Sequence, residues 1–480
     1  MRVDILLKGG AVIDGTGRPA VFADVAVSGD QIIAVGTGLD IEATDTIDCG
    51  GLTIAPGFID VHTHHDEEVL SNPAMDCAVS QGVTTLINGN CGFSIAPLTR
   101  RAPHPAPLNA ILPAGLNFAD FAAYRNRLES EPPAVNTACL VGHGTLRIEV
   151  MDDLDRPATP DEIERMKALL RQSLESGALG LSSGTFYPPA RAAPTEELIE
   201  LSKVLVPFGA LYVTHMRDEG DRVEEALAET FEIGRRAGVG VHISHHKCAG
   251  LANHGLSTRT LGMISEASRH QDVGLDVTPY VASATMLNSG RHRQASRVIV
   301  TASAPHPECA GRDLAVVAAE WGCSLDQAVA RLLPALGIFF LMAEEDVRRI
   351  LSYESAIVCS DAIAAGSHPH PRLWGTFPRA IGHYGRDIGL FPVETAIRKM
   401  TSLPADRFQI RDRGRVIAGA FADIVVFEAD RLIDEATYEE PTRRARGIER
   451  VFVNGVSVYE RGRPTGMRPG HFIAPDRLTR

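Results

Sequence analysis

The sequence predicts an α/β protein whose main part is a (β/α)8 barrel of the TIM-barrel type. Apolar runs of strand length recur eight times, and helical patterns separate most of them. This alternation is typical of parallel strands that are each followed by a helix. The runs lie near residues 58–63, 83–88, 136–141, 179–182, 210–214, 239–244, 273–278 and 356–360.

The two ends of the chain predict a small β-sandwich domain. Residues 1–55 contain short alternating runs separated by Gly-rich turns, a pattern typical of antiparallel strands. The same pattern returns near the C-terminus, where Asn454-Gly455 is a strong hairpin signal. We therefore predict that 1–55 and 412–480 form one β domain around a barrel at 56–411.

The barrel region also carries a clear helix start and one long insertion. Thr159-Pro160-Asp161-Glu162 has capping-box spacing with proline in the first helical turn. After the seventh strand, at about 285–350, the helical patterns 312–321 and 325–333 interrupt the repeat. Loops of this kind open at the catalytic face of a barrel, so we predict a helical lid. A separate structural appendage is the alternative.

Composition excludes several classes of protein. With 480 residues, 44% of them hydrophobic, the chain can bury a large core. Its 47 Lys and Arg against 60 Asp and Glu give a formal net charge of -13, which disfavours nucleic acid and anionic membranes as partners. The eight cysteines form no CxxC pair, and neither a secretion signal nor a membrane-spanning run is evident. We expect a cytoplasmic protein that acts on a small molecule; its oligomeric state is not predictable.

Potential metal ligands gather at the predicted strand ends. His62 and His64 close the first strand on one face, because side chains alternate with a period of two. Cys91 follows the second strand, and His215 and His245 end the fifth and sixth. A lone histidine or cysteine is usually structural, but a barrel brings all of its strand ends together. These five residues therefore predict a metal site.

Alternation along the sixth strand helps to choose between neighbouring histidines. His245 shares a face with the apolar Val241 and Ile243, whereas His242 and His246 lie on the opposite face. We therefore select His245 as the ligand. His65, like His242 and His246, is expected to make structural contacts, and His143 after the third strand is equally compatible with site and scaffold.

The ligand types predict zinc and a hydrolytic reaction. Thiolate and imidazole favour zinc over magnesium or calcium, which prefer oxygen. Zinc activates water and polarises carbonyl groups. Asp361 follows the eighth strand, where it can accept the water proton and then protonate a leaving nitrogen. The alternative for Asp361 is an ordinary helix N-cap.

The motifs resemble a known family. Residues 56–64, PGFIDVHTH, resemble the entry motif of the amidohydrolase superfamily, whose members are metal-dependent barrel hydrolases. The segments Asn90-Cys91-Gly92, 214–217, 244–247 and Ser360-Asp361 are similar to the N-acyl-D-amino-acid deacylases, also called D-aminoacylases. Many relatives bridge two metals with a carboxylated lysine on the fourth strand, and this chain lacks that lysine. In the deacylase family a cysteine from the second strand takes a metal-ligand role instead, and Cys91 matches that cysteine.

The resemblance implies a set of roles. It implies a tightly held zinc at Cys91, His215 and His245, a weaker second position near His62 and His64, and Asp361 as the catalytic acid and base. The D configuration of the substrate is likewise implied only by the family. By the same similarity, Tyr187, Lys247 and Arg372 are candidates to bind the substrate carboxylate, with Tyr280 assisting; a solvated surface role is the alternative for each.

A basic segment suggests the side-chain preference. Arg291 and Arg293 lie just past the seventh strand, at the base of the insertion. They can pair with a second carboxylate on the substrate, which favours N-acyl-D-glutamate over an apolar substrate. The alternative is that they coat the surface or pair with acidic residues of the lid.

Two other functions compete with the deacylase hypothesis. One is a different amidohydrolase reaction, either deamination or the hydrolysis of cyclic amides such as hydantoins and dihydroorotate. The missing strand-four lysine and the presence of Cys91 disfavour the cyclic amides. The other is a scaffold that keeps the fold without a metal, but such a protein should have lost ligand positions, and all of them are present here.

Overall fold

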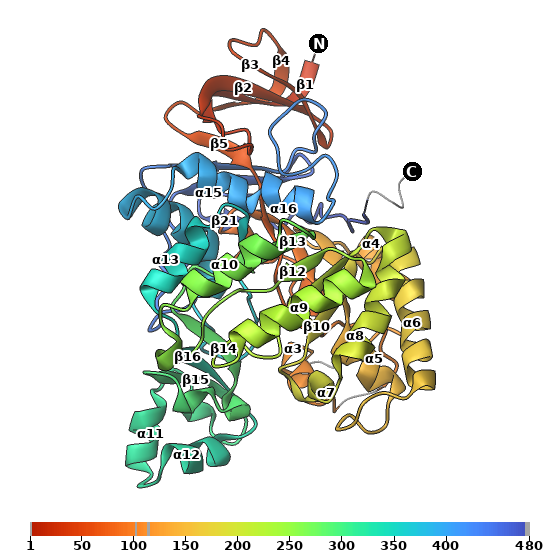
Figure 1. The fold of residues 1–480 in the computed structure, drawn as a ribbon. Coiled ribbons are helices and arrows are strands. Elements are labelled where there is room, and N and C mark those ends of the chain that lie inside the picture. Colours follow the sequence, from red (N-terminus) through yellow and green to blue (C-terminus); the bar gives the residue numbers. More distant parts are fainter. Residues whose placement is uncertain (1, 101–102, 113–115, 476–480) are drawn as a thin grey trace.

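Eight parallel strand positions form the central barrel of the computed structural model, which describes residues 2–100, 103–112 and 116–475 (Figure 1). Consecutive strands pair in parallel from β6 to β8 and from β9 to β17, with β8 and β9 together filling the third position. The strands are β6 (Phe58–Asp60), β7 (Val83–Asn88), β8 (Asn136–Cys139), β9 (Val141–Gly142), β10 (Gly180–Gly184), β11 (Leu211–His215), β12 (Val241–Ile243), β13 (Val273–Val277) and β17 (Ala356–Val358). The predicted TIM-type barrel is confirmed.

Closure of the barrel brings the first and last strand ends together. Thr63, just past β6, forms a parallel bridge with Ala362, just past β17. The Asp361 N–H donates to the His62 carbonyl at 2.8 Å, and the His64 N–H donates to the Ala362 carbonyl at 3.0 Å. Residues from the two ends of the barrel sequence are thereby neighbours in space.

Helices surround the barrel. The predicted start of one of them is confirmed: the Thr159 side chain and Glu162 form a capping box at α6, with proline in the first turn. The longer helices are α4 (Phe121–Ser130), α5 (His143–Val150), α6 (Pro160–Glu175), α8 (Thr195–Ser202), α9 (Val223–Ala237), α10 (Ser257–Ala267), α13 (Glu344–Ser352), α14 (Arg372–Arg379), α15 (Val393–Met400) and α16 (Ser402–Arg407). Short helices are α1 (Glu68–Ser71), α2 (Asp76–Val79), α3 (Leu108–Ile111) and α7 (Pro188–Arg191), and a π-helix spans Ala380–Asp387.

Strands from both ends of the chain share one nine-stranded sheet, in the order β21-β20-β19-β18-β5-β1-β2-β3 with β4 beside β1. Apolar residues from both ends, among them Val25 and Phe452, pack into one buried cluster. The strands are β1 (Arg2–Val12), β2 (Val21–Ser28), β3 (Gln31–Gly36), β4 (Glu42–Asp48), β5 (Thr53–Pro56), β18 (Ile424–Phe427), β19 (Ile448–Val453), β20 (Val456–Glu460) and β21 (Arg463–Pro464). The two-layer sandwich and the domain boundaries stay predictions.

The insertion after β13 differs from the helical segment that we expected. Its two predicted helices are present, as α11 (Leu314–Glu320) and α12 (Leu325–Leu332). However, β14 (Ala282–Met286), β15 (Val298–Ser303) and β16 (Ala335–Phe340) form an antiparallel sheet in the order β14-β16-β15. β-Branched and aromatic residues such as Val298, Ile338 and Phe339 explain these strands. The insertion lies at the far end of the molecule from the terminal sheet (Figure 1).

A buried ion network beside β9 predicts a pH-dependent contribution to stability. His143 Nε2 donates to Glu197 at 2.9 Å, and Arg147 donates to both oxygens of the same carboxylate at 2.6 and 2.7 Å. His143 therefore belongs to the scaffold. Burial raises the pKa of Glu197, but the hydrogen bond from His143 and the charge of Arg147 outweigh it and lower the pKa to about 2.

We expect Glu197→Gln to lower the unfolding free energy by about 3 kcal/mol at pH 7, because ionised Glu197 stabilises the fold above its unfolded pKa of about 4.3. This stabilisation disappears as the pH falls from about 4.5 towards 2. Urea unfolding of both proteins across that range measures the difference. The exposed neighbour Glu196→Gln is the control, and a difference that does not change with pH would contradict this account.

Candidate metal centre

The Cys91 thiol lies at the centre of three imidazole rings. Its Sγ is 3.2 Å from His62 Nε2, 3.4 Å from His245 Nε2 and 3.6 Å from His215 Nδ1. The four residues come from the ends of β6, β7, β11 and β12, and all are buried. Ligand atoms around a tetrahedral zinc, with bonds of about 2.0 to 2.3 Å, are about 3.6 Å apart. The spacing and the donor types therefore fit zinc.

A second group of ligand atoms shares Cys91. The side-chain donors of His62, His64, Cys91 and Asp361 lie within 4.8 Å of one another. Asp361 Oδ1 is 3.4 Å from His64 Nε2 and 3.6 Å from His62 Nε2. The first group, Cys91 with His215 and His245, meets the same criterion. The two candidate groups of metal ligands thus have the thiol in common.

Electrostatics favour the ionised forms of the thiol and the carboxylate. Burial raises the pKa of Cys91, but the charges of His62 and His245 hold it well below its usual range. Burial likewise raises the pKa of Asp361, and the Arg372 guanidinium at 2.7 Å holds it well below the usual range. A thiolate is the form of cysteine that binds metal, and a carboxylate is the form that accepts a proton.

Three residues of the cluster have a left-handed backbone. The φ angles are +53° at Cys91, +33° at His245 and +50° at Asp361. Residues other than glycine seldom adopt this region, and such strain tends to gather at functional sites. Each of the three closely follows a strand end, where the chain must turn sharply to aim its side chain over the barrel.

Two buried carboxylates that the sequence analysis did not select support the ligand histidines from behind. Glu219 lies 2.9 Å from His245 Nδ1 and 3.5 Å from His215 Nε2, the nitrogens that face away from Cys91. Asp276 lies 3.6 Å from His62 Nδ1. Such carboxylates orient metal-binding imidazoles and raise their basicity. In the sequence, Asp276 could have been noticed as an acidic residue inside the apolar strand β13. For Glu219 the only indication was its position four residues after His215.

Most of the predicted substrate-binding residues lie around this cluster. Lys247 Nζ is 2.6 Å from Glu219 and 2.8 Å from His245 Nδ1. Arg291 is also buried and pairs with Glu219 at 2.6 Å. The Tyr187 ring is 4.8 Å from the His215 ring, between centroids. Together with Arg372 beside Asp361, these side chains border both ion positions.

Two predicted binding residues lie elsewhere. Arg293 is 66% exposed and pairs with Asp326 of α12 at 2.8 Å, so it belongs to the surface of the insertion. The Tyr280 ring packs 5.1 Å from His370 and 5.0 Å from the Arg379 guanidinium, on the side of α14. Sequence position placed both after the seventh strand, but it could not give the direction of their side chains.

None of the neighbouring histidines, His65, His242 and His246, belongs to a group of candidate metal ligands among the described residues. His242 Nε2 is 2.8 Å from Asp276, and His246 Nε2 is 2.9 Å from the Thr260 hydroxyl. Burial lowers the pKa of His65 to about 3, so that this ring is neutral. These rings support the barrel around the cluster.

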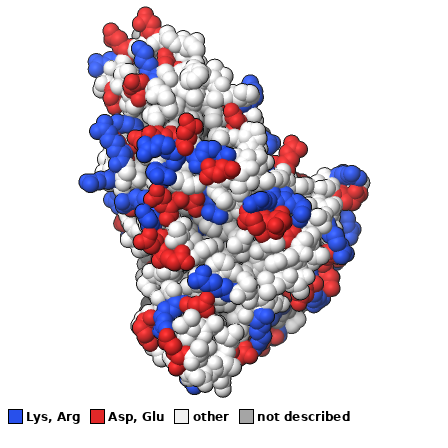
Figure 2. Space-filling view, turned by 90° about the vertical axis from the view of Figure 1, so that its left-hand side faces the viewer, with Lys and Arg blue, Asp and Glu red and all other residues white. Residues whose placement is uncertain are grey.

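The molecular surface offers no single-sign patch on the face drawn in Figure 2, where Lys and Arg alternate with Asp and Glu. Among the described residues, no helix has the length and apolar character needed to cross a bilayer.

Comparisons with known proteins agree on one family. A model of the amidohydrolase family matches residues 45–310 and 324–459. A D-aminoacylase from Alcaligenes xylosoxydans xylosoxydans is 50% identical over 98% of this chain and 97% of its own length. An N-acyl-D-aspartate deacylase from the same organism is 46% identical over 99% of this chain and 95% of its own.

A solved structure extends the similarity to three dimensions. It is the N-acyl-D-glutamate deacylase of Bordetella bronchiseptica, complexed with zinc and a phosphonate inhibitor that mimics the tetrahedral intermediate of the reaction. Its TM-score is 0.96 at 40% sequence identity, and the match covers 99% of this chain and 100% of that one.

Proposed function

The chain belongs to the amidohydrolase family as a metal-dependent enzyme of the D-aminoacylase group, and from this premise we propose that it uses zinc to hydrolyse the amide bond of N-acyl-D-amino acids. The products are a free D-amino acid and a carboxylate. One observation carries the proposal: a buried thiol faces three imidazoles beside an ionised Asp361. That arrangement matches metal-assisted hydrolysis, and packing of the barrel does not require it.

Two groups of side chains are available to bind zinc. Cys91, His215 and His245 would hold one ion, which the family resemblance implies is the tighter one, and His62, His64 and Asp361 would share Cys91 at a second position. When bound, zinc lowers the pKa of water towards about 7 and polarises the substrate carbonyl. Glu219 lies behind His215 and His245, and Asp276 lies behind His62, so these carboxylates favour the ring orientations in which the opposite nitrogen would bind the ion.

Asp361 moves the proton. Its Oδ1 faces His62 and His64, so a water molecule near these rings lies within its reach. Asp361 accepts a proton from the attacking water and then delivers it to the amide nitrogen, which leaves as a neutral amine. Arg372, on Oδ2, keeps the carboxylate ionised before the attack.

The substrate carboxylate needs cationic and hydroxyl partners because it is desolvated in a buried site. Arg372, Lys247 and the Tyr187 hydroxyl supply them, and all three side chains border the ion cluster. Glu219 neutralises one of the two cations that it contacts, Lys247 or Arg291, which leaves one positive charge in that group for the substrate.

The basic segment that contains Arg291 and Arg293 suggested N-acyl-D-glutamate as the specific substrate. In the structure Arg291 pairs with Glu219 and Arg293 pairs with Asp326, so each arginine already has a carboxylate partner. A second substrate carboxylate must displace one of these partners. Arg291 is the one that borders the ion cluster, so Arg291→Ala should raise KM more for N-acyl-D-glutamate than for N-acyl-D-leucine, and equal effects would remove the assignment.

Steady-state hydrolysis tests the proposed function as a whole. We expect N-acetyl and N-formyl D-amino acids to be turned over much faster than their L isomers. Treatment with a chelator should abolish activity, and added zinc should restore it. Hydantoins and dihydroorotate serve as the comparison, because turnover of the ring substrates alone would replace this proposal with cyclic-amide hydrolysis.

Glu219 allows a separate test of the ion site. Glu219→Gln keeps the size and a hydrogen-bonding oxygen but leaves Lys247 and Arg291 uncompensated beside His215 and His245. We expect zinc affinity to fall about 10- to 100-fold, measured by competition with a chromophoric chelator. The exposed Glu225→Gln is the matched control, and unchanged affinity in Glu219→Gln would show that the carboxylate does not act on the ligands.

A further inference from the structure

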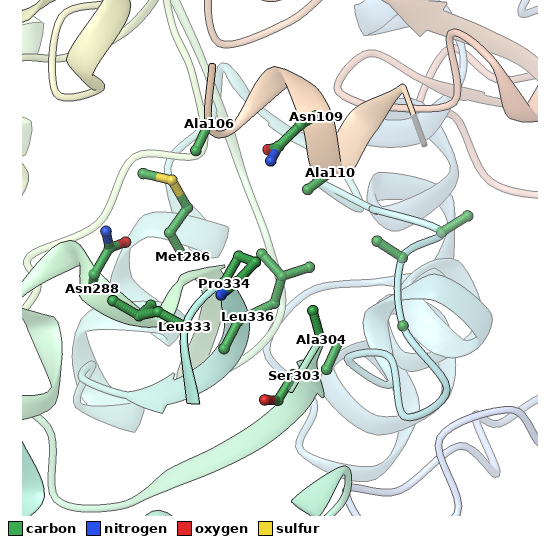
Figure 3. Close-up of a pocket in the computed structure, with 15 residues that line it drawn as sticks. Ala106, Asn109, Ala110, Met286, Asn288, Ser303, Ala304, Leu333, Pro334 and Leu336 are labelled. Carbon is green, nitrogen blue, oxygen red and sulfur yellow. The ribbon is translucent and has the colours of Figure 1, made fainter. Parts of the chain in front are cut away.

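A large apolar cavity lies between the barrel loops and the insertion. Its volume is about 730 Å³, within the range of about 300–1,000 Å³ that is common for ligand sites. Ala106 and Ala110 at helix α3 form one wall, and Met286, Leu333 and Leu336 of the insertion face them (Figure 3). None of the residues that line it, all within the described ranges, carries a charge.

The cavity adjoins the ion cluster on two sides. A small hollow lined by His64 shares Ala110 and Ala364 with it. A second hollow, lined by Arg372, shares Leu336 and Ala365 with it. The cavity therefore shares lining residues with both of the hollows that border the proposed reaction site.

Asp361 lies between the Arg372 side and the His64 side of the ion cluster. Its Oδ2 contacts Arg372, and its Oδ1 contacts His64. A substrate whose amide nitrogen faces Asp361 and whose carboxylate meets Arg372 has its amino-acid half on the Arg372 side. The acyl half then lies on the His64 side, where a hollow that is also lined by Glu67 and Glu68 shares Ala110 and Ala364 with the apolar cavity.

We infer that this cavity binds the acyl chain and that the enzyme prefers N-acyl-D-amino acids with extended hydrocarbon acyl groups over N-acetyl compounds. The inference rests on the proposed function and specifies its substrate class. An uncharged wall cannot compensate a buried carboxylate, whereas it removes a hydrocarbon chain from water.

The first test is a series of N-acyl-D-alanines with acetyl, butyryl, hexanoyl and octanoyl groups, assayed with the zinc-loaded full chain. Each buried methylene is worth about a three- to fourfold change. We expect kcat/KM to rise by at least about 30-fold from acetyl to octanoyl. Octanoate should also inhibit the enzyme far more strongly than acetate, since it is the matching product.

Filling the cavity gives the second test. Ala110→Phe narrows it from α3, and Ala304→Phe narrows it from the end of β15 (Figure 3). Either change should lower the octanoyl-to-acetyl ratio of kcat/KM by at least about tenfold. The matched control is Ala319→Phe, on the exposed face of α11 away from the cavity, which should leave the ratio as it is in the parent protein. Thermal unfolding of each variant checks that it is folded.

The outcomes separate this inference from the proposed function. If kcat/KM is independent of acyl length while N-acetyl-D-amino acids are hydrolysed, the inference fails and the function stands. A rise that follows the length of the amino-acid side chain instead of the acyl chain also overturns it. If no N-acyl-D-amino acid of any length is hydrolysed, the proposed function itself fails. Octanoate inhibition that Ala110→Phe does not weaken would place the acyl chain elsewhere.

Discussion

Replacement of Cys91 by serine is expected to lower kcat/KM by at least about 1,000-fold, equivalent to about 4 kcal/mol of transition-state stabilisation. Cys91 Sγ is the atom shared by both groups of ligands, so its loss removes a donor from each. A serine hydroxyl is neutral at pH 7 and binds zinc much more weakly than a thiolate. The measurements are zinc content after dialysis and steady-state hydrolysis of an N-acyl-D-amino acid.

Cys323→Ser is the matched control, since Cys323 is only half-buried and lies in the insertion. It should keep both zinc and activity. Far-UV circular dichroism and thermal unfolding of Cys91→Ser without metal establish whether the barrel is intact. A folded Cys91→Ser protein that binds zinc as tightly as the parent would exclude the thiol as the central ligand.

Replacement of Asp361 by asparagine is expected to lower kcat by about 100- to 10,000-fold with a smaller change in KM. Asparagine preserves the size of the side chain, but it cannot accept the water proton or return it to the amide nitrogen. Zinc at Cys91, His215 and His245 should stay bound, because Asp361 belongs only to the second group of ligands. The separation of kcat from zinc content distinguishes proton transfer from metal binding.

Asp152→Asn serves as the control for Asp361→Asn, because the Asp152 side chain is 96% exposed. It should change neither kcat nor KM. If Asp361→Asn instead loses zinc in proportion to activity, the carboxylate acts as an essential ligand. Retention of full activity would remove Asp361 from the reaction altogether.

The order of strands and the strand-end residues were accessible from the sequence alone. Buried strands of a barrel are apolar on both faces, so the run of β17, which is apolar and buried at every position, stands out from its surroundings. A barrel also determines which strand ends meet, which is why strand order alone groups residues as distant as His62 and Asp361. Their contact follows from closure of β6 against β17.

The insertion and the binding residues were less accessible. Three strands of the insertion pair with one another and not with the barrel, and short apolar runs do not reveal their partners. Arg291 and Arg293 are two residues apart, yet one is buried on Glu219 and the other is exposed on Asp326. A 3-10 turn over Arg291–Arg293 directs them differently, and charge composition does not record that turn.

The sequence by itself predicted the barrel, and it pointed to the five candidate ligands and the acidic residue after the last strand. Periodicity and strand order can be found along the chain, and a barrel fold brings the strand ends together in space. Only the tertiary structure decided that Cys91 is shared by two groups, that Glu219 and Asp276 lie behind the imidazoles, and that an apolar cavity lies next to the hollow that His64 lines. These features depend on side-chain directions and on contacts between distant loops. No pattern along the chain encodes the angle at which two loops meet.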